Sequence, residues 1–208
     1  MVASKGVDSL KGQQKREQLI EAAASEIAKK GSNSLRLRDV AARCSVTTGM
    51  LQHYFETRDE LVLAAFEHGA LKYVDRWRGA LPNDPSSEFE IRVLVDQLSA
   101  EFSDSESSAL WIDLCAQASR DESLRGLVRH VYGEWRELLV DVISRSTEHE
   151  RRAQRLPLGA SVNLIIAVFD GLELSLAAGA GSIDAPEASR LVADLVTVLF
   201  PEAIHALP

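Results

Sequence analysis

Two short apolar segments, separated by three residues near the start of the chain, constrain its fold more than any other feature. Residues 37–44 are expected to form a short helix with Val40 and Ala41 on its inner face. Residues 48–54 are expected to form a second short helix with Leu51 on its inner face. The intervening Ser45, Val46 and Thr47 favour a break between them. Two helices this short around a three-residue turn are typical of a helix-turn-helix. The same pair can also form a helical hairpin inside an ordinary bundle.

The rest of the chain also has the helical period, and no window shows sustained strand alternation. Thr57 with Glu60 predicts a capping box, and Asp184 predicts an N-cap. Polar segments at 82–87, 103–108 and 146–157 are expected to be breaks or loops. The sequence therefore predicts an all-α fold of about nine helices. Besides the short pair, these helices are expected near residues 13–30, 58–81, 91–102, 109–119, 124–142, 159–181 and 186–199.

Charge is distributed unevenly along the 208 residues, whose net charge is −8. Residues 1–55 hold nine Lys/Arg against five Asp/Glu, whereas the remainder holds 14 against 26. A basic N-terminal part is compatible with a nucleic-acid partner, and the acidic remainder is not. We expect a helix-turn-helix DNA-binding domain at 1–56 and a larger helical domain at 57–208.

Residues with catalytic or metal-binding chemistry are sparse. Two cysteines, Cys44 and Cys115, can form neither a disulfide framework nor a Cys-rich zinc site. The five histidines lie far apart, and only Glu202 and His205 share a spacing known from di-iron bundles, which need that spacing twice. We therefore expect no catalytic site, no metal and no cofactor, and Cys44 is interpreted as a packed side chain.

The most apolar stretch, residues 161–181, contains Asp170 and Glu173 near its middle. A charge at the centre of a membrane span costs about 2.5–3.5 kcal/mol, so a buried helix is the better interpretation. The N-terminus lacks an apolar segment of signal-peptide length. The expected location is the cytoplasm, with no membrane partner.

The second short helix has an outer face suited to reading a duplex. Gln52 can pair with adenine in two places, and Met50 or a threonine methyl can contact thymine. A short helix also fits the major groove, which is about 12 Å wide. The residues expected to face outward are Thr47, Thr48, Met50, Gln52 and His53.

Residues 16–68 contain four motifs in a specific order: LRDVAARCSV at 37–46, TTGML at 47–51, HYF at 53–55 and RDEL at 58–61. With these motifs, residues 16–68 resemble the DNA-binding domain of the TetR family of bacterial regulators. Two positions depart from the family pattern: Ser45 replaces the turn glycine, and Gln52 replaces the tyrosine after the leucine. A non-glycine residue in a left-handed turn costs on the order of 1 kcal/mol.

The resemblance implies roles for particular residues. It implies that Tyr54 and Arg58 contact phosphates, and that Thr47 and Thr48 contact backbone or bases. Arg36 and Arg38 are added from their charge and their place beside the first short helix. The alternative for each arginine is a solvated surface charge.

The larger domain contains three further motifs: Trp111 with QASRD at 117–121, Tyr132 with Trp135, and DGLEL at 170–174. With these motifs, residues 84–205 resemble the C-terminal domain of the BetI-type branch of the same family. This resemblance implies a domain that binds a small molecule and pairs with a second subunit. The last two helices are apolar and rich in small residues, so we expect a four-helix dimer interface. The alternative is that both helices are simply interior.

Aromatic and acidic residues in this domain suggest a ligand site, and an aromatic wall with a carboxylate favours a cationic ligand. The choline-responsive character of the branch points the same way, although aromatics at helical spacing can also be core. The candidate ligand residues are Trp77, Trp111, Asp113, Gln117, Tyr132, Trp135, Asp170 and Glu173.

The sequence thus predicts a dimeric, ligand-responsive transcriptional regulator, most simply a repressor released from a palindromic operator by a small molecule. The first alternative is a helical ligand carrier or enzyme that does not bind DNA. The second is an architectural DNA binder without a ligand.

Overall fold

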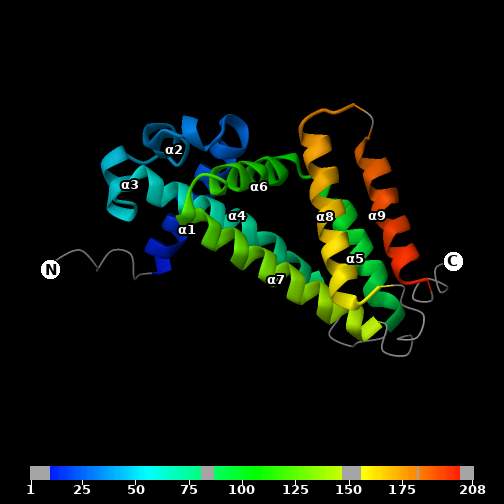
Figure 1. Cartoon of the computed structure of the whole chain (residues 1–208). Helices are drawn as coiled ribbons and strands as arrows, with labels where there is room; N and C mark the ends of the chain where they lie inside the picture. The colour runs from blue at the N-terminus through cyan, green and yellow to red at the C-terminus, as the bar shows by residue number, and fades with distance from the viewer. Residues whose placement is uncertain (1–9, 81–86, 147–155, 182, 202–208) are drawn as a thin grey trace. The chain divides into compact units, whose positions relative to one another are not determined.

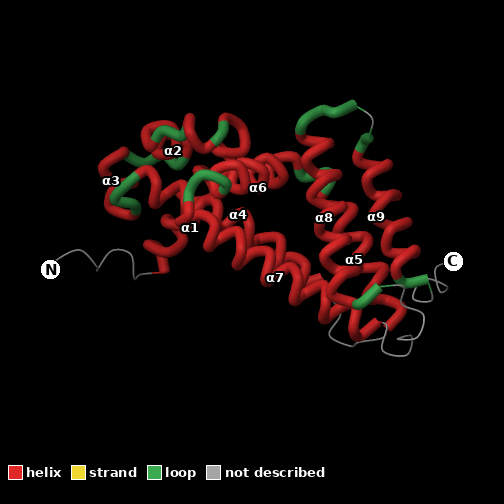
Figure 2. Tube along the Cα trace, viewed as in Figure 1, coloured by secondary structure: helices red, strands yellow, loops and turns green. Residues whose placement is uncertain are grey.

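The computed structural model describes residues 10–80, 87–146, 156–181 and 183–201, and over these residues it is helical with no strand (Figure 2). The all-α prediction is confirmed. The predicted loops at 82–87 and 146–157 lie almost entirely outside the described residues. The elements are α1 (Leu10–Lys30), the 3₁₀ helix η1 (Ser32–Ser34), α2 (Leu37–Arg43), α3 (Thr48–Tyr54), α4 (Arg58–Ala80), α5 (Ser87–Glu101), α6 (Ser105–Ala118), α7 (Glu122–Ser146), α8 (Leu158–Ala177) and α9 (Ala185–Leu199).

The helix starts have local causes that the sequence revealed. The Thr57 hydroxyl accepts the Glu60 amide at 3.1 Å, and Asp184 accepts the Glu187 amide at 2.8 Å, as predicted. The returning bond of the capping box differs by one residue, because the Glu60 carboxylate accepts the amide of Glu56 at 2.8 Å.

The break expected at 103–108 is shorter than predicted, since α6 already begins at Ser105. Asp104 explains the early start: one carboxylate oxygen accepts the Ser107 amide at 3.1 Å, and the other accepts the Ser107 hydroxyl at 2.9 Å. An aspartate at this position supplies acceptors to the free amides of the first turn.

The chain forms two compact units, and the first contains residues 10–71 and 109–128. In this unit α1 packs against η1 and α2, and α2 packs against α3 (Figure 1). Its core holds buried side chains from α1, α2, α3, the residue that follows α3, and the first half of α4. These are Leu19, Ala23, Ile27, Val40, Leu51, Phe55, Leu61 and Phe66.

The second unit contains residues 72–108 and 129–201, and α9 packs against both α5 and α8 (Figure 1). Its core includes Leu98, Leu139, Ile143, Val162, Val196 and Phe200. Among the described helices α8 is long and apolar enough to span a membrane by composition. It instead buries Val162, Ile165 and Phe169 in this core and carries Asp170 and Glu173.

Candidate nucleic-acid interface and buried acidic cluster

Helix α3 presents a polar outer face above two fully buried anchors. Leu51 and Phe55 are 0 % exposed and fix the helix to the first unit. The Thr47 hydroxyl accepts the Met50 amide at 3.1 Å and so defines where the helix begins. The residues expected to face outward, Thr47, Thr48, Met50, Gln52 and His53, are all exposed. Their side chains are therefore available to an external partner.

The turn before α3 is a reverse turn held by backbone hydrogen bonds. The Ser45 amide donates to the Ala42 carbonyl at 3.1 Å, and the Val46 amide donates to the Ala41 carbonyl at 3.0 Å. Ser45 has φ +54°, the left-handed conformation that glycine adopts more easily. The turn keeps its shape without the glycine, at the cost of local strain.

Several polar and basic side chains surround α3. Arg36 is the exposed N-cap residue of α2, and Arg38 is exposed with its Nε 3.4 Å from an Asp39 carboxylate oxygen. Tyr54 is half-buried and meets the His53 ring edge-on at 5.8 Å between centroids. Arg43 is engaged inside the unit, because it pairs with Glu26 of α1 at 3.3 Å.

Arg58, expected to contact phosphate, has protein partners in the structure. Its Nε donates to the Leu35 carbonyl at 3.1 Å, and one Nη donates to the Ser32 carbonyl. Its other Nη lies 2.8 Å from Asp59. The guanidinium therefore ties the start of α4 to residues 32–35, and the phosphate contact stays a prediction.

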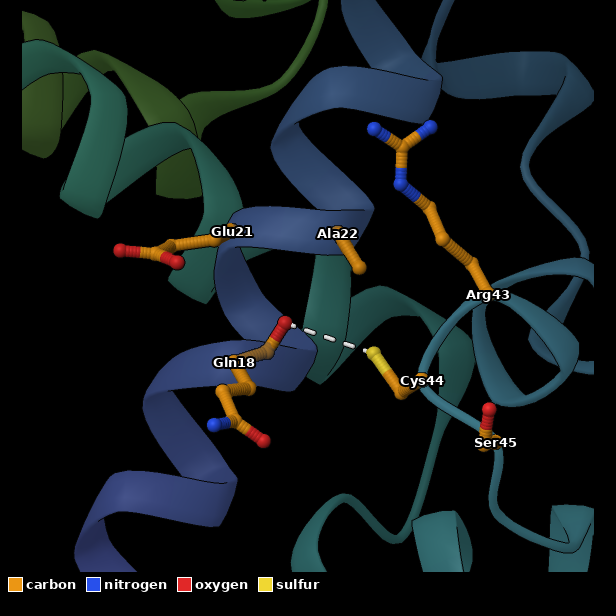
Figure 3. A pocket seen from close by; sticks show the side chains of 6 residues that line it. All are labelled: Gln18, Glu21, Ala22, Arg43, Cys44 and Ser45. Carbon is orange, nitrogen blue, oxygen red and sulfur yellow. Dashed lines mark hydrogen bonds between the residues drawn. The ribbon is translucent and has the colours of Figure 1, made fainter.

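A pocket of about 380 Å³ opens beside the turn of the first unit (Figure 3). The Cys44 thiol donates to the main-chain carbonyl of Gln18 at 3.5 Å. Burial raises the pKa of this thiol, which keeps it protonated and weakly nucleophilic, in line with a packing role. The pocket is lined by Gln18, Glu21, Ala22, Arg43, Cys44 and Ser45.

A buried pair of carboxyl groups lies in the second unit. Glu101 is 1 % exposed and accepts hydrogen bonds from Arg76 at 3.0 Å and from the Trp77 indole at 3.2 Å. Glu173 is 4 % exposed and hydrogen-bonded to Ser108. Burial raises the pKa of each carboxyl to about 7, because it removes the ionised form from water.

Aromatic rings lie beside the buried acidic cluster, the name used for Glu101 and Glu173, because Trp77 donates a hydrogen bond to Glu101. Trp77 lies 4.5 Å from Trp135 between ring centroids, and Trp135 lies 5.8 Å from Phe169. The Tyr132 hydroxyl donates to Asp170 at 2.6 Å. The second unit thus holds five of the predicted ligand residues, namely Trp77, Tyr132, Trp135, Asp170 and Glu173.

The other three predicted ligand residues, Trp111, Asp113 and Gln117, lie on the part of α6 that belongs to the first unit. Asp113 accepts the backbone amide of Ser32 at 2.6 Å and the Gln117 side-chain amide at 3.3 Å. Trp111 is half-buried.

Sequence reasoning missed Glu101, although a signal was present. Leu94, Leu98 and Glu101 follow the i, i+4, i+7 spacing of the buried stripe of α5, so a carboxyl group occupies a core position. Among the described residues, no three His, Cys, Asp or Glu side chains gather as a metal ion would require.

Comparison with known proteins shows the family to which the chain belongs. A family model for bacterial regulatory proteins of the tetR family matches residues 19–65, which contain the exposed α3. A second model, for the C-terminal domain of BetI-type transcriptional repressors, matches residues 91–201. The chain belongs to the TetR family of bacterial regulators.

Curated relatives place this TetR-family protein near the BetI branch. It is 28% identical to the HTH-type transcriptional regulator BetI of Brucella canis over 187 residues, which cover 88% of this chain and 90% of that one. It is 30% identical to BetI of Burkholderia cenocepacia over 192 residues, which cover 89% and 93% of the two chains.

Solved structures share the TetR-family fold. A protein of Pseudomonas aeruginosa PAO1 assigned as a transcriptional regulator has a TM-score of 0.74 at 22% identity, with 97% of each chain covered. A protein of Saccharomonospora viridis with the same assignment, whose crystal structure is a complex with choline, has a TM-score of 0.77 at 18% identity. That comparison covers 88% of this chain and 96% of the other.

The predicted family and function class are confirmed. The protein is a BetI-type transcriptional regulator of the TetR family, not an enzyme, and its helix-turn-helix lies in residues matched by the N-terminal family model. Regulators of this family bind operator DNA and small-molecule effectors, typically as dimers.

Proposed function

We propose that this regulator is a homodimeric repressor that holds a palindromic operator through α3 and is released from it by a small cation. The exposure of the outer face of α3 above two buried anchors carries the DNA-binding part of this proposal. Repression is supported by the match of the C-terminal model to BetI-type repressors. Such a protein acts in the cytoplasm, where the chromosome is accessible to it.

In this proposal α3 reads bases while its surroundings hold the backbone. Gln52, Met50 and His53 face the floor of the major groove, and Thr47 and Thr48 contact backbone or bases. Phosphates are held by Tyr54 and by the arginines at 36, 38 and 58. Because phosphate contacts release counterions, affinity for any duplex falls steeply with salt.

Dimerisation is proposed to use the outer faces of α8 and α9. Leu174 is 53% exposed and Val198 is 54% exposed, so both apolar side chains are available to a second subunit. On α8, the exposed Ala167 and Gly171 lie on the same face as Leu164 and Leu174 and permit close helix approach. Two copies of this face form a four-helix interface and place two α3 helices on successive major grooves about 34 Å apart.

The effector site is proposed at the buried acidic cluster. Glu101 and Glu173 are buried with raised pKa values, so a bound cation would favour their ionised forms. Trp77, Trp135 and Tyr132 supply ring faces that attract a cation. Choline in the Saccharomonospora viridis structure is a quaternary ammonium compound of this class.

Release is proposed as a shift between two populations of the dimer. The effector favours a dimer whose α3 helices no longer match successive grooves. Helix α4 is suited to transmit this change, because one continuous helix contains both Arg58 and Trp77.

The DNA-binding part is tested by fluorescence anisotropy with a labelled random duplex at several salt concentrations. We expect binding at low salt, and the logarithm of the binding constant should fall steeply and linearly with the logarithm of the salt concentration. A ligand carrier or enzyme on the same helical body predicts no duplex affinity at any salt concentration.

The effector part is tested with choline and its uncharged isostere 3,3-dimethylbutan-1-ol. We expect choline to change the tryptophan fluorescence and to release the duplex, and the isostere to do neither. Glu173→Gln should weaken the response to choline, whereas Glu137→Gln, on the exposed side of α7, should not. Equal responses to both compounds would contradict a cationic site, and an architectural binder predicts no response at all.

A further inference from the structure

We infer that Asp113 is a positioning residue for the DNA-binding unit: from α6 it fixes η1, and through η1 and Arg58 it fixes the starts of α2 and α4. The inference rests on the proposed operator binding. It gives Asp113 a role other than the ligand contact that the sequence suggested.

The central contact is a hydrogen bond between residues 81 positions apart. The Asp113 carboxylate accepts the Ser32 backbone amide at 2.6 Å, a short distance that marks a charge-assisted bond. Ser32 is 3 % exposed, so its amide would lose its partner without gaining water if the carboxylate were removed. The Gln117 side chain donates to the other carboxylate oxygen at 3.3 Å and orients it.

The carbonyl of the same Ser32 continues the connection to α4. It accepts a hydrogen bond from the Arg58 guanidinium, whose Nε also donates to the Leu35 carbonyl at 3.1 Å. Leu35 directly precedes Arg36, the N-cap residue of α2, and Arg58 is the first residue of α4. One carboxylate on α6 therefore supports the segment that leads into α2 and that binds Arg58, the first residue of α4.

Close packing of α4 and α6 supports this arrangement independently. A Cβ atom built on Gly69 of α4 would lie 2.1 Å from Cδ2 of Leu110 on α6, so a larger residue at position 69 would force the Leu110 side chain to move. Leu110 is buried in the contact. Helix α6 therefore meets α4 at Gly69 and meets η1 through the Asp113 hydrogen bond.

The position of α3 depends on this connection, because α3 follows α2 through the turn at residues 44–47. Helix α6 begins in the second unit with residues 105–108 and continues in the first from residue 109. Residues 109–118 of α6, which include Asp113, belong to the same unit as η1, α2 and α3, so the contact can hold α3 in place through η1 and α2.

The test compares Asp113→Ala and Asp113→Asn in the full-length protein. The control is Glu67→Gln, which removes one negative charge from an exposed position on α4 in the same unit. Each variant is titrated with the duplex that the wild type enriches from a random pool and with an unrelated duplex. Amide hydrogen exchange is followed at Ser32.

We expect Asp113→Ala to lower the ratio of specific to non-specific affinity by about five- to tenfold, as loss of one charge-assisted hydrogen bond would allow. Asp113→Asn should lower it less, because the amide oxygen still accepts. Exchange at Ser32 should rise in the same order. Glu67→Gln should leave both quantities unchanged.

If Asp113→Ala leaves the ratio of specific to non-specific affinity unchanged, the inference is overturned. This includes the case in which both affinities fall equally because less protein is folded, since the ratio is then also unchanged. An equal fall of the ratio in Glu67→Gln would also overturn it, since charge alone would then be responsible. If the wild type enriches no duplex, the proposed operator binding fails and the inference fails with it. If the wild type enriches a duplex and Asp113→Ala has the same affinity ratio as the wild type, the inference fails but the proposed function stands.

Discussion

Glu173→Gln should stabilise the protein at alkaline pH and leave it almost unchanged at acidic pH. The Glu173 carboxyl is 4 % exposed, and burial raises its pKa from 4.5 to about 7. Asp170, Glu101 and Asp104 raise the pKa further by repulsion, while Ser108 opposes the shift. Glutamine has the shape of the protonated carboxyl but cannot ionise.

The sign and magnitude follow from proton linkage. Between pH 4.5 and about 7 the folded state retains a proton that the unfolded state releases, so the free energy of unfolding falls as pH rises. At 1.36 kcal/mol per pH unit, the full effect above pH 7 is about 3 kcal/mol. Glu173→Gln removes this cost, so its advantage over the wild type should appear between pH 5 and pH 8.

The measurement is urea unfolding of both proteins at pH 5, 6, 7 and 8. Glu137→Gln, an exposed position on α7, serves as the control and should follow the wild type. A Glu173→Gln variant that is no more stable relative to the wild type at pH 8 than at pH 5 would refute the assignment of a buried, proton-holding carboxyl.

Three further substitutions test other parts of the molecule. Ser45→Gly should raise the free energy of unfolding by about 1 kcal/mol, because it relieves φ +54°, and thermal unfolding measures it. Gln52→Ala should change the preferred base pair in each half-site and cost about 1–3 kcal/mol on the original site, with non-specific affinity unchanged; enrichment from a random pool with the same base preference would contradict this. Leu174→Asp should yield a monomer in sedimentation at micromolar concentration, whereas Leu63→Asp, in the exposed part of the first unit, should not.

Helix positions were predictable because their causes are local. The apolar stripes and the caps at Thr57 and Asp184 lie within a few residues of the boundaries they set. The early start of α6 was missed because Asp104 lies in a polar segment that is typical of a loop. In the structure its carboxylate accepts hydrogen bonds from the Ser107 amide and hydroxyl. A short polar segment with such a residue can begin a helix as readily as interrupt one.

The sites were predictable only where one helix contains the pattern. The outer face of α3 could be read from spacing, since α3 supplies all of it. The partners of Glu101 come from α4, and two of the partners of Arg58 are backbone carbonyls, which leave no mark in the sequence. Asp113 was predicted as one of the polar groups of an aromatic ligand site, whereas in the structure its carboxylate accepts the amide of Ser32, 81 residues away.

The most direct test of the account is methylation protection of the enriched duplex by dimethyl sulfate, which modifies guanine N7 in the major groove and adenine N3 in the minor groove. With α3 in the major groove of two half-sites, the account predicts protection of guanine N7 in two patches about one helical turn apart. Protection confined to adenine N3, or none at either groove, would contradict it.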